Sequence, residues 1–354
     1  MKRKKQFSIW LITAMLLAPC ALLAAEVSKP VKVFILMGQS NMVGMGHIHG
    51  DKGETLEQAV KMEKLYPYLL DADGNWAESK NVRNVQVMVG RGGMNVLHNE
   101  WMQVGAGVGK GKATLGVEYG LGHELGGSPG EPVMLLKSCI GNRSLGWDLL
   151  PPGSKGYDFT VKDRKTGKEV TYTYAGYKES PMRWEKGTQP AKINWYAGKQ
   201  YDDDVANARQ VLSELDKYYP GAKRYEIAGF FWWQGEKDCG DEALASHYEE
   251  NLVHLINSLR KDFNAPKAKF VLATLGEAKP GIGGNEQKVL DAQLAVDGNS
   301  GKHPEFKGNV ATVFTHPMAR GGSGNGHYGG NAKVYMDVGE TMGKAMVGLL
   351  ENNQ

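Results

Sequence analysis

Five short apolar runs restrict the folds open to this chain more than any other feature. Each run is rich in β-branched and large apolar residues and lacks the strict alternation of a strand with one face in water. That composition is typical of strands buried on both faces of a sheet. The runs occupy residues 31–37, 132–137, 225–233, 269–275 and 309–314.

Segments with helical spacing alternate with these runs from residue 132 to the end of the chain. In 201–219, for example, Val205 and Ala208 fall on one helical face, and Pro220 stops the pattern. This alternation predicts an α/β fold with a mainly parallel five-stranded sheet covered by helices on both faces. The other predicted helices occupy residues 116–125, 242–262, 287–296 and 331–350.

Composition sets further bounds on the chain. Its 354 residues, 41% hydrophobic and 23% charged, suit one large domain or two modest ones. The formal net charge of +3 is small for this length, so it offers no electrostatic reason to expect nucleic acid as a partner. Residues 51–99 are polar, and we expect them to be irregular apart from a weak strand signal at 85–89.

The first 25 residues have the composition of a secretory signal peptide. The basic run 2–5 precedes the apolar stretch 9–25, and Ala25 supplies a small residue at a cleavage point. We therefore expect an exported protein, periplasmic or secreted, with residues 26–354 as its mature domain. An uncleaved anchor is the alternative. No second apolar stretch is long enough to cross a membrane, so no stable span is expected after cleavage.

Residues 151–198 interrupt the alternation of strands and helices. Within them, 160–163 and 170–174 alternate apolar or β-branched residues with polar ones on either side of the turn-rich segment 164–168. This pattern predicts a small β-hairpin inserted in the domain. Aromatic residues are frequent here, and they would either bind sugar rings or pack the insertion onto the domain. These aromatic residues are Tyr172, Tyr174, Tyr177, Trp184 and Trp195.

Polar residues gather where three of the apolar runs end. Ser40 follows the first run, Gly141 and Asn142 follow the second, and a Gln-Gly-Glu-Lys-Asp segment (234–238) follows the third. A fourth cluster, which contains His327, precedes the last predicted helix. The carboxyl ends of parallel strands share one edge of a sheet, so we expect these groups to converge there.

These residue types suit acyl transfer. A serine hydroxyl needs a base to become a nucleophile, and histidine has a suitable pKa for that task. A carboxylate can orient the imidazole ring, and fixed donors must stabilise the anionic tetrahedral intermediate. Ser40 and Gly141 offer backbone N–H groups, and Gln234 offers a side-chain amide.

Four segments together resemble the successive conserved blocks of the SGNH hydrolases. Among these enzymes the chain is most similar to the branch of sialate O-acetylesterases and acetylxylan esterases (carbohydrate esterase family 6). The resemblance implies a flavodoxin-like, three-layer α/β/α fold, no metal or other cofactor, and removal of acetyl groups from an acetylated carbohydrate. The segments are Gly38–Met42, Lys137–Leu145, Trp233–Asp238 and His327–Ala332.

Carried over to this chain, the resemblance implies Ser40 as the nucleophile and His327 as its base. The expected oxyanion hole consists of the Ser40 and Gly141 N–H groups and the Gln234 amide. Many members carry an aspartate three residues before the histidine, but this chain has Gly324 there. We therefore expect Glu236, ahead of Asp238, to be the third catalytic residue. The residues expected around the substrate are Gln39, Asn41, Asn142, Arg143 and Asp238.

Several alternatives remain open from the sequence. His316 is a rival base, and His47 with His49 would be a weak metal pair. Arg143 and Arg320 would either contact a sugar carboxylate or remain solvated. The same chemistry would serve a lipid or thioester hydrolase with an apolar trough beside the serine. A non-catalytic sugar-binding protein on a degenerate scaffold would place His327 beyond hydrogen-bond reach of that serine.

Two cysteines, Cys139 and Cys239, lie beyond the predicted signal peptide. Export permits a disulfide between them, and both flank loops of the predicted site. A disulfide that braces the site is therefore one expectation, and two buried thiols are the other.

Overall fold

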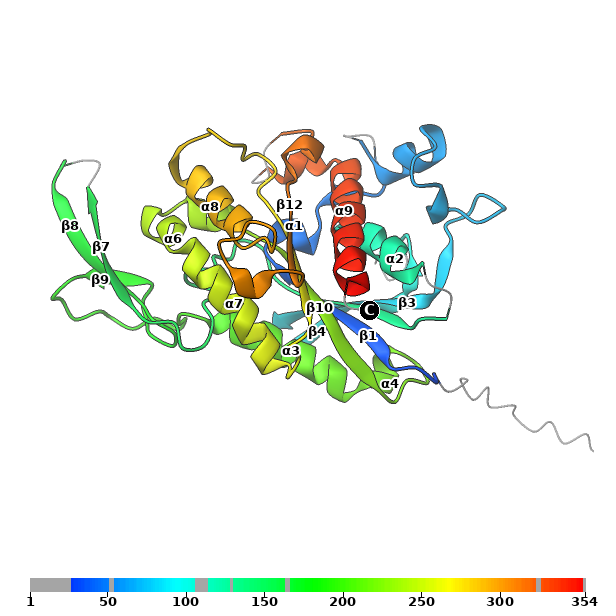
Figure 1. The fold of residues 1–354 in the computed structure, drawn as a ribbon, viewed down its shortest axis with the longest axis horizontal. Helices are drawn as coiled ribbons and strands as arrows, with labels where there is room; N and C mark the ends of the chain where they lie inside the picture. The colour runs from blue at the N-terminus through cyan, green and yellow to red at the C-terminus, as the bar shows by residue number, and fades with distance from the viewer. Residues whose placement is uncertain are drawn as a thin grey trace, which may run out of the picture.

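A computed structural model describes residues 27–50, 54–105, 114–127, 130–162, 166–322 and 326–352 of the chain. The predicted signal peptide lies outside these residues. Within them, seven strands form one sheet at the centre of the molecule, in the order β12-β11-β10-β1-β6-β3-β4 (Figure 1). The strands are β1 (Val31–Gly38), β3 (Glu78–Gly90), β4 (Gly93–Gln103), β6 (Val133–Ser138), β10 (Tyr225–Trp233), β11 (Lys269–Ala273) and β12 (Val310–Val313).

Neighbouring strands of this sheet run parallel except for β3 and β4, which are antiparallel. The five predicted strands are β1, β6, β10, β11 and β12. The expected number was wrong, because β3 and most of β4 lie in the segment 51–99, which was predicted to be irregular apart from the weak strand signal at 85–89 that falls within β3. Buried polar residues interrupt the apolar pattern in the rest of β3: the Arg83 Nε donates to the Tyr218 carbonyl at 2.9 Å, and the Asn84 amide donates to Glu100 at 3.0 Å.

Helices cover both faces of the sheet (Figure 1). Alternate residues of β1 point into separate cores, so Val33 and Ile35 pack on one side while Phe34 and Leu36 pack on the other. The first core also holds residues of α3 (Lys199–Ser213), α4 (Leu215–Tyr218), α7 (Tyr248–Asp262) and α8 (Gly284–Ala295). The second holds residues of α2 (Glu118–Gly126) and α9 (Ala332–Glu351).

Shorter elements connect these layers. The short helices are α1 (Ser40–Val43), α5 (Glu236–Cys239) and α6 (Glu242–Ser246), and a two-stranded sheet pairs β2 (Gly46–His47) with β5 (Thr114–Leu115). Single helical turns of other types are η1 (Gln58–Met62), η2 (Pro67–Leu69), η3 (Pro304–Phe306), η4 (His316–Met318) and η5 (His327–Gly330). The predicted helix 242–262 is divided into α6 and α7 at His247.

The predicted insertion forms a separate three-stranded sheet that extends from the body of the molecule (Figure 1). It contains the antiparallel strands β7 (Tyr157–Lys162), β8 (Glu169–Tyr174) and β9 (Arg183–Glu185). The expected hairpin corresponds to β7 and β8, and β9 adds a third strand. Tyr174 is buried against Ala243 and Leu244 of α6, which attaches the base of the insertion to the domain.

Cys139 is buried and Cys239 half-buried, and both are free thiols. The predicted disulfide between them was therefore wrong, and the alternative of two separate thiols is the one observed. In the part of the chain that the structure describes, no helix is long and apolar enough to cross a membrane.

Candidate active site

Ser40 lies directly after β1, at the first residue of α1. Gly38 makes the tight turn into α1 possible. Its φ is +149°, and a Cβ at this position would lie 2.2 Å from the backbone oxygen of Trp233. Ser40 is half-buried, while Gln39 and Asn41 on either side of it are buried. The strand therefore presents a single partly accessible hydroxyl at the carboxyl edge of the sheet.

His327 faces this hydroxyl from the far end of the sequence. Its Nε2 atom lies 2.9 Å from the Oγ atom of Ser40, within hydrogen-bond distance. His327 and Tyr328 have φ values of +53° and +52°, which are unfavourable for residues other than glycine. The Tyr328 ring is buried and stacks on Trp233 with ring centroids 5.9 Å apart. This packing holds the backbone that carries the imidazole.

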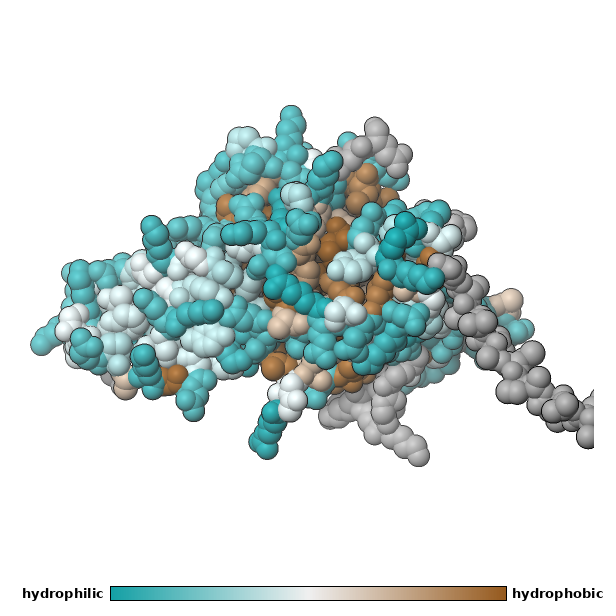
Figure 2. Space-filling view, turned by 90° about the horizontal axis from the view of Figure 1, so that it is seen from below, coloured by the Kyte–Doolittle hydropathy of each residue, from teal (hydrophilic) through white to brown (hydrophobic). Residues whose placement is uncertain are grey.

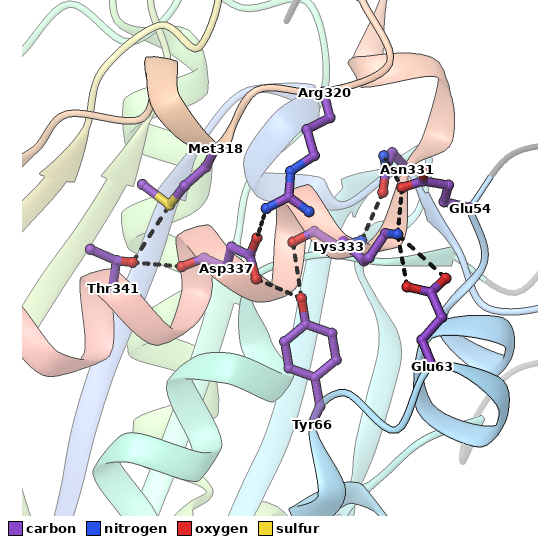
Figure 3. Close-up of polar contacts among 9 residues, drawn as sticks. All are labelled: Glu54, Glu63, Tyr66, Met318, Arg320, Asn331, Lys333, Asp337 and Thr341. Atoms are coloured by element: carbon purple, nitrogen blue, oxygen red, sulfur yellow. Dashed lines mark hydrogen bonds and ion pairs between the residues drawn. The ribbon is translucent and has the colours of Figure 1, made fainter.

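Polar contacts anchor both sides of the segment that carries His327 (Figure 3). On its N-terminal side, Arg320 donates to Asp337 of α9 at 2.7 Å. On its C-terminal side, Asn331 donates to Glu54 at 2.7 Å. Arg320, which the sequence left as a possible contact for a sugar carboxylate, is thus engaged within the protein.

Glu236, the predicted third catalytic residue, does not pair with His327. Among the described residues, no hydrogen bond or ion pair joins a carboxylate to that imidazole ring; instead, Glu236 Oε1 accepts a hydrogen bond from the side-chain amide of Asn41. Its Oε2 atom is shielded from solvent and has no hydrogen-bond partner in the described chain. The contacts therefore connect Glu236 to Ser40 through the backbone neighbour of Ser40.

The environment of Glu236 favours its neutral form. Burial raises the pKa of Glu236 to about 8, and the negative charge of nearby Glu277 adds to this effect. At neutral pH the carboxyl group is therefore mostly protonated. The hydrogen bond that the Asn41 amide donates favours the ionised form and opposes these two effects, but burial outweighs it.

The predicted oxyanion donors occupy different positions. Gly141 lies beside Ser40, because a Cβ built on it would be 3.4 Å from the Ser40 Cβ. Gln234 is fully buried, and its amide nitrogen donates only within the protein. A primary amide has two hydrogens, so these internal bonds leave none for a substrate oxygen. The three acceptors are Gln39 Oε1 at 3.2 Å, the Arg143 carbonyl at 3.0 Å and Asp238 Oδ2 at 2.6 Å.

Asp238, which was expected at the substrate, is also fully buried. It accepts hydrogen bonds from the backbone N–H groups of Leu145 at 2.9 Å and Gly146 at 2.8 Å. Burial raises the pKa of Asp238 to about 6. These contacts tie the end of the third predicted strand to the loop after β6, and thereby support the wall on which Gly141 lies.

Asn142 and Arg143 follow Gly141, and they take different directions. Asn142 is exposed, has a φ of +58° and borders the pocket beside Ser40. The Arg143 guanidinium stacks on Trp195 at 4.9 Å from the ring centroid. Its Nε donates to Gln200 Oε1 at 3.3 Å. Asn142 is thus placed to contact a substrate, and Arg143 supports the loop.

A cavity of about 720 Å³ surrounds the Ser40–His327 pair. Its wall combines amide, carboxyl and ammonium groups with one tryptophan, one methionine and one leucine. Two of these residues, Met182 of the insertion and Leu244 of α6, carry no signal in the sequence, because they lie outside the polar clusters. The wall includes Gln39, Gly141, Asn142, Ser144, Trp147, Met182, Glu236, Lys237, Gly240, Asp241 and Leu244.

The remaining histidine alternatives lie elsewhere. His316 Nδ1 is 2.8 Å from the Gly276 carbonyl oxygen rather than near Ser40. His49 pairs with Glu57 at 2.9 Å. Within the described ranges, no group of three or more histidine, cysteine, aspartate or glutamate side chains is placed to hold a metal ion.

Comparison with known proteins identifies relatives of the chain. A probable carbohydrate esterase of Arabidopsis thaliana is 35% identical over 71 residues, which cover 20% of this chain and only 26% of that protein. The structure of a carbohydrate acetylesterase from Xanthomonas citri has 15% identity and a TM-score of 0.52, over 91% of this chain and 56% of that one. NanS has 14% identity and a TM-score of 0.47, over 92% of this chain and 99% of that one.

At such identities the likeness to the Xanthomonas citri structure bears on the fold alone, and it agrees with the mixed α/β architecture. The sequence match is broader. The family model described as "Carbohydrate esterase, sialic acid-specific acetylesterase" matches residues 30–177 and 170–347, which together span most of the chain. The chain therefore belongs to this family of carbohydrate esterases.

Proposed function

We propose that the chain is a carbohydrate O-acetylesterase that uses Ser40 as its nucleophile and His327 as its general base. The observation that carries this proposal is the 2.9 Å contact between His327 Nε2 and Ser40 Oγ inside an open pocket. Membership of the esterase family supplies the reaction class. The contact argues against the alternative of a degenerate scaffold, which required His327 to be out of reach.

The proposed reaction has two halves. Ser40 Oγ attacks the carbonyl carbon of the acetyl group while its proton passes to His327 Nε2. The tetrahedral intermediate then breaks its bond to the sugar oxygen, which takes the proton from His327 and leaves as a hydroxyl group. In the second half, His327 takes a proton from water, the hydroxide attacks the acetyl-enzyme, and acetate departs as Ser40 regains its proton.

We assign the oxyanion hole to the backbone N–H groups of Ser40 and Gly141. Gln234, which the sequence suggested as a third donor, would then serve the hole indirectly, because its internal bonds hold neighbouring loops together. The exposed Asn142 amide at the pocket wall is a further donor for the intermediate or for a sugar hydroxyl. Loss of one such donor typically costs about 2.7–4 kcal/mol of transition-state stabilisation.

We further propose that catalysis relies on a Ser40–His327 dyad. Glu236 would act on Ser40 through Asn41, as a neutral positioning group, rather than on the His327 ring. This assignment modifies the role expected from the family resemblance.

The pocket wall favours a sugar over a lipid. Gln39, Asn142, Lys237 and Asp241 present polar groups, and Trp147 presents an aromatic ring, whereas a lipid hydrolase needs a continuous apolar trough. The helices on both sheet faces support the three-layer, flavodoxin-like arrangement of SGNH hydrolases. Export to the periplasm or the medium stays a prediction based on residues 1–25.

The test is acetate release from 4-nitrophenyl acetate and from an O-acetylated xylan by wild-type protein and three variants. We expect Ser40→Ala and His327→Gln to lower kcat/KM by about 10³-fold or more, and the matched control His316→Gln to remain near wild type. Wild-type rates for Ser40→Ala would refute the nucleophile. If His327→Gln stays active and His316→Gln is inactive, the general base is His316 instead of His327.

A further inference from the structure

One face of the insertion sheet carries only aromatic and aliphatic side chains on its two long strands. Alternate residues of a strand share a face, and the register of β7 and β8 pairs these side chains directly across the strands. The residues between them in β7 are polar and exposed, so they form the opposite face. We call the six residues the aromatic face: Tyr157, Phe159, Val161, Val170, Tyr172 and Tyr174.

The domain covers only the base of this aromatic face. Tyr174 is buried under α6, and the His247 ring stacks on Tyr157 with centroids 3.6 Å apart. Farther along the strands, Phe159 meets His247 only edge to face, with centroids 6.3 Å apart. Tyr172 remains partly exposed, and its hydroxyl makes no hydrogen bond to any described residue. Phe159, Val161, Val170 and Tyr172 each keep part of their surface in solvent, so the outer part of the aromatic face is only partly covered.

Arg183 of β9 connects the aromatic face to the pocket. Its guanidinium lies over the Tyr172 ring at 4.8 Å from the centroid and pairs with Asp241 at 2.7 Å. Asp241 and the neighbouring Met182 line the cavity that contains Ser40. Arg183 therefore bridges a residue of the pocket wall, Asp241, and the Tyr172 ring of the aromatic face.

The chemistry of this surface matches a glycan chain. Sugar rings expose C–H faces that pack on aromatic rings, and their hydroxyl groups bind guanidinium, carboxylate and phenol groups. Seen from below, the insertion end of the molecule is mostly pale or teal rather than brown, which indicates intermediate to polar hydropathy (Figure 2). The Arg183 guanidinium, the Asp241 carboxylate and the Tyr172 hydroxyl place polar groups beside the rings, and a sugar chain can hydrogen-bond to such groups whereas an acyl chain cannot.

We propose that the aromatic face binds the backbone of a polysaccharide whose acetyl group enters the Ser40 pocket. The substrate is then an acetylated polymer rather than a free acetylated sugar. This inference rests on the proposed esterase function, and it adds the substrate class and the residues that recognise the chain beyond the reacting unit.

The experiment compares wild type with Tyr172→Ala, Tyr172→Phe and the control Thr171→Val. Thr171 lies next to Tyr172 in β8 but on the opposite face, where its hydroxyl meets Thr160 at 2.8 Å. The substrates are chemically O-acetylated xylan and mannan, the corresponding acetylated monosaccharides, and 4-nitrophenyl acetate. We expect wild type to prefer a polymer over its monosaccharide. Tyr172→Ala should lose about tenfold in kcat/KM on that polymer, chiefly through KM, with unchanged rates on 4-nitrophenyl acetate.

Tyr172→Phe, which keeps the ring, should retain most of the polymer activity, and Thr171→Val should match wild type. The inference would be overturned if wild type preferred neither polymer over its monosaccharide. It would also be overturned if Tyr172→Ala acted on the polymer at the wild-type rate, or if this variant lost the same factor on every substrate. A Tyr172→Ala defect confined to 4-nitrophenyl palmitate, a long-chain ester assayed beside the other substrates, would overturn it as well. Binding is checked apart from catalysis by affinity electrophoresis of Ser40→Ala in unsubstituted xylan and mannan, where an added Tyr172→Ala change should abolish retardation. Absence of acetate release by wild type from all substrates would instead refute the esterase proposal itself.

Discussion

The substitution Glu236→Gln distinguishes two roles for this carboxyl group. Glutamine cannot ionise, but it keeps an oxygen that accepts the hydrogen bond from Asn41. If neutral Glu236 positions Ser40 through Asn41, the variant should keep kcat/KM within a few fold of wild type near neutral pH. If ionised Glu236 instead orients His327, the variant should lose about 10⁴-fold, as an aspartate-to-asparagine change does in a catalytic triad.

The same substitution should change how stability depends on pH. Glu236 has an ordinary pKa of 4.5, which burial and Glu277 raise to about 8 in the folded protein. Between these values the folded state holds a proton that the unfolded state has lost. The free energy of unfolding therefore falls as pH rises through this window. The slope is about 1.4 kcal/mol per pH unit, which gives at most about 5 kcal/mol, and solvent in the pocket beside the carboxyl reduces that figure.

The assay measures urea unfolding by far-UV circular dichroism and kcat/KM on 4-nitrophenyl acetate at a series of pH values from about 5 to 9. Relative to wild type, the free energy of unfolding of Glu236→Gln should increase as the pH rises to about 8, and the difference between the two proteins should then stay constant. The exposed-site control Glu214→Gln should not show this increase. Parallel stability profiles for wild type and Glu236→Gln would refute the raised pKa, and a 10⁴-fold loss of activity would refute the dyad.

Three further predictions follow from the packing around the site. In Gly38→Ala the alanine Cβ would lie 2.2 Å from the Trp233 backbone oxygen, so the turn before Ser40 should unfold. Acetate release should be abolished, and circular dichroism should show lowered thermal stability. Lys137 lies 2.6 Å from the buried Glu118, so Lys137→Met leaves that carboxylate without its cation. Urea unfolding should show that the free energy of unfolding falls by about 3–5 kcal/mol, and an added Glu118→Leu change should largely restore it. Burial raises the pKa of the Cys239 thiol, so it should react with Ellman's reagent much more slowly in the folded than in the urea-unfolded protein.

The strands that the sequence predicted are those whose side chains are apolar on both faces. β1, for example, needs no information beyond its own residues, because both of its faces enter hydrophobic cores. β3 gave only the weak signal at 85–89, because it also buries polar side chains. The acceptor of the Arg83 Nε is the Tyr218 carbonyl, far away in the sequence, and nothing local to β3 indicates that this partner exists.

The convergence of Ser40, Gly141 and His327 was predictable because the edge of a parallel sheet brings strand ends together. The use of Gln234 was not. Its amide nitrogen bonds Gln39, Arg143 and Asp238, and which of these acceptors it meets depends on how the loops after β1, β6 and β10 pack. Pocket residues contributed by the insertion and by α6 likewise have no local signal, because their position depends on how the insertion packs against α6.

The orientation of His327 can be explained without a carboxylate on its ring. In a triad the acid fixes the imidazole and stabilises its protonated form. Here a backbone with positive φ at both His327 and Tyr328 sets the direction of the side chain, at a cost of about 1–3 kcal/mol for each residue. Burial of the Tyr328 ring against Trp233 returns about 1.5–3 kcal/mol, and the contacts of Arg320 and Asn331 restrain the segment on both sides. Packing thus supplies the orientation, while stabilisation of the imidazolium is left to the pocket itself. Glu236 lines this pocket, so the loss of its proton near pH 8 would add a negative charge there and change the electrostatics in which His327 works.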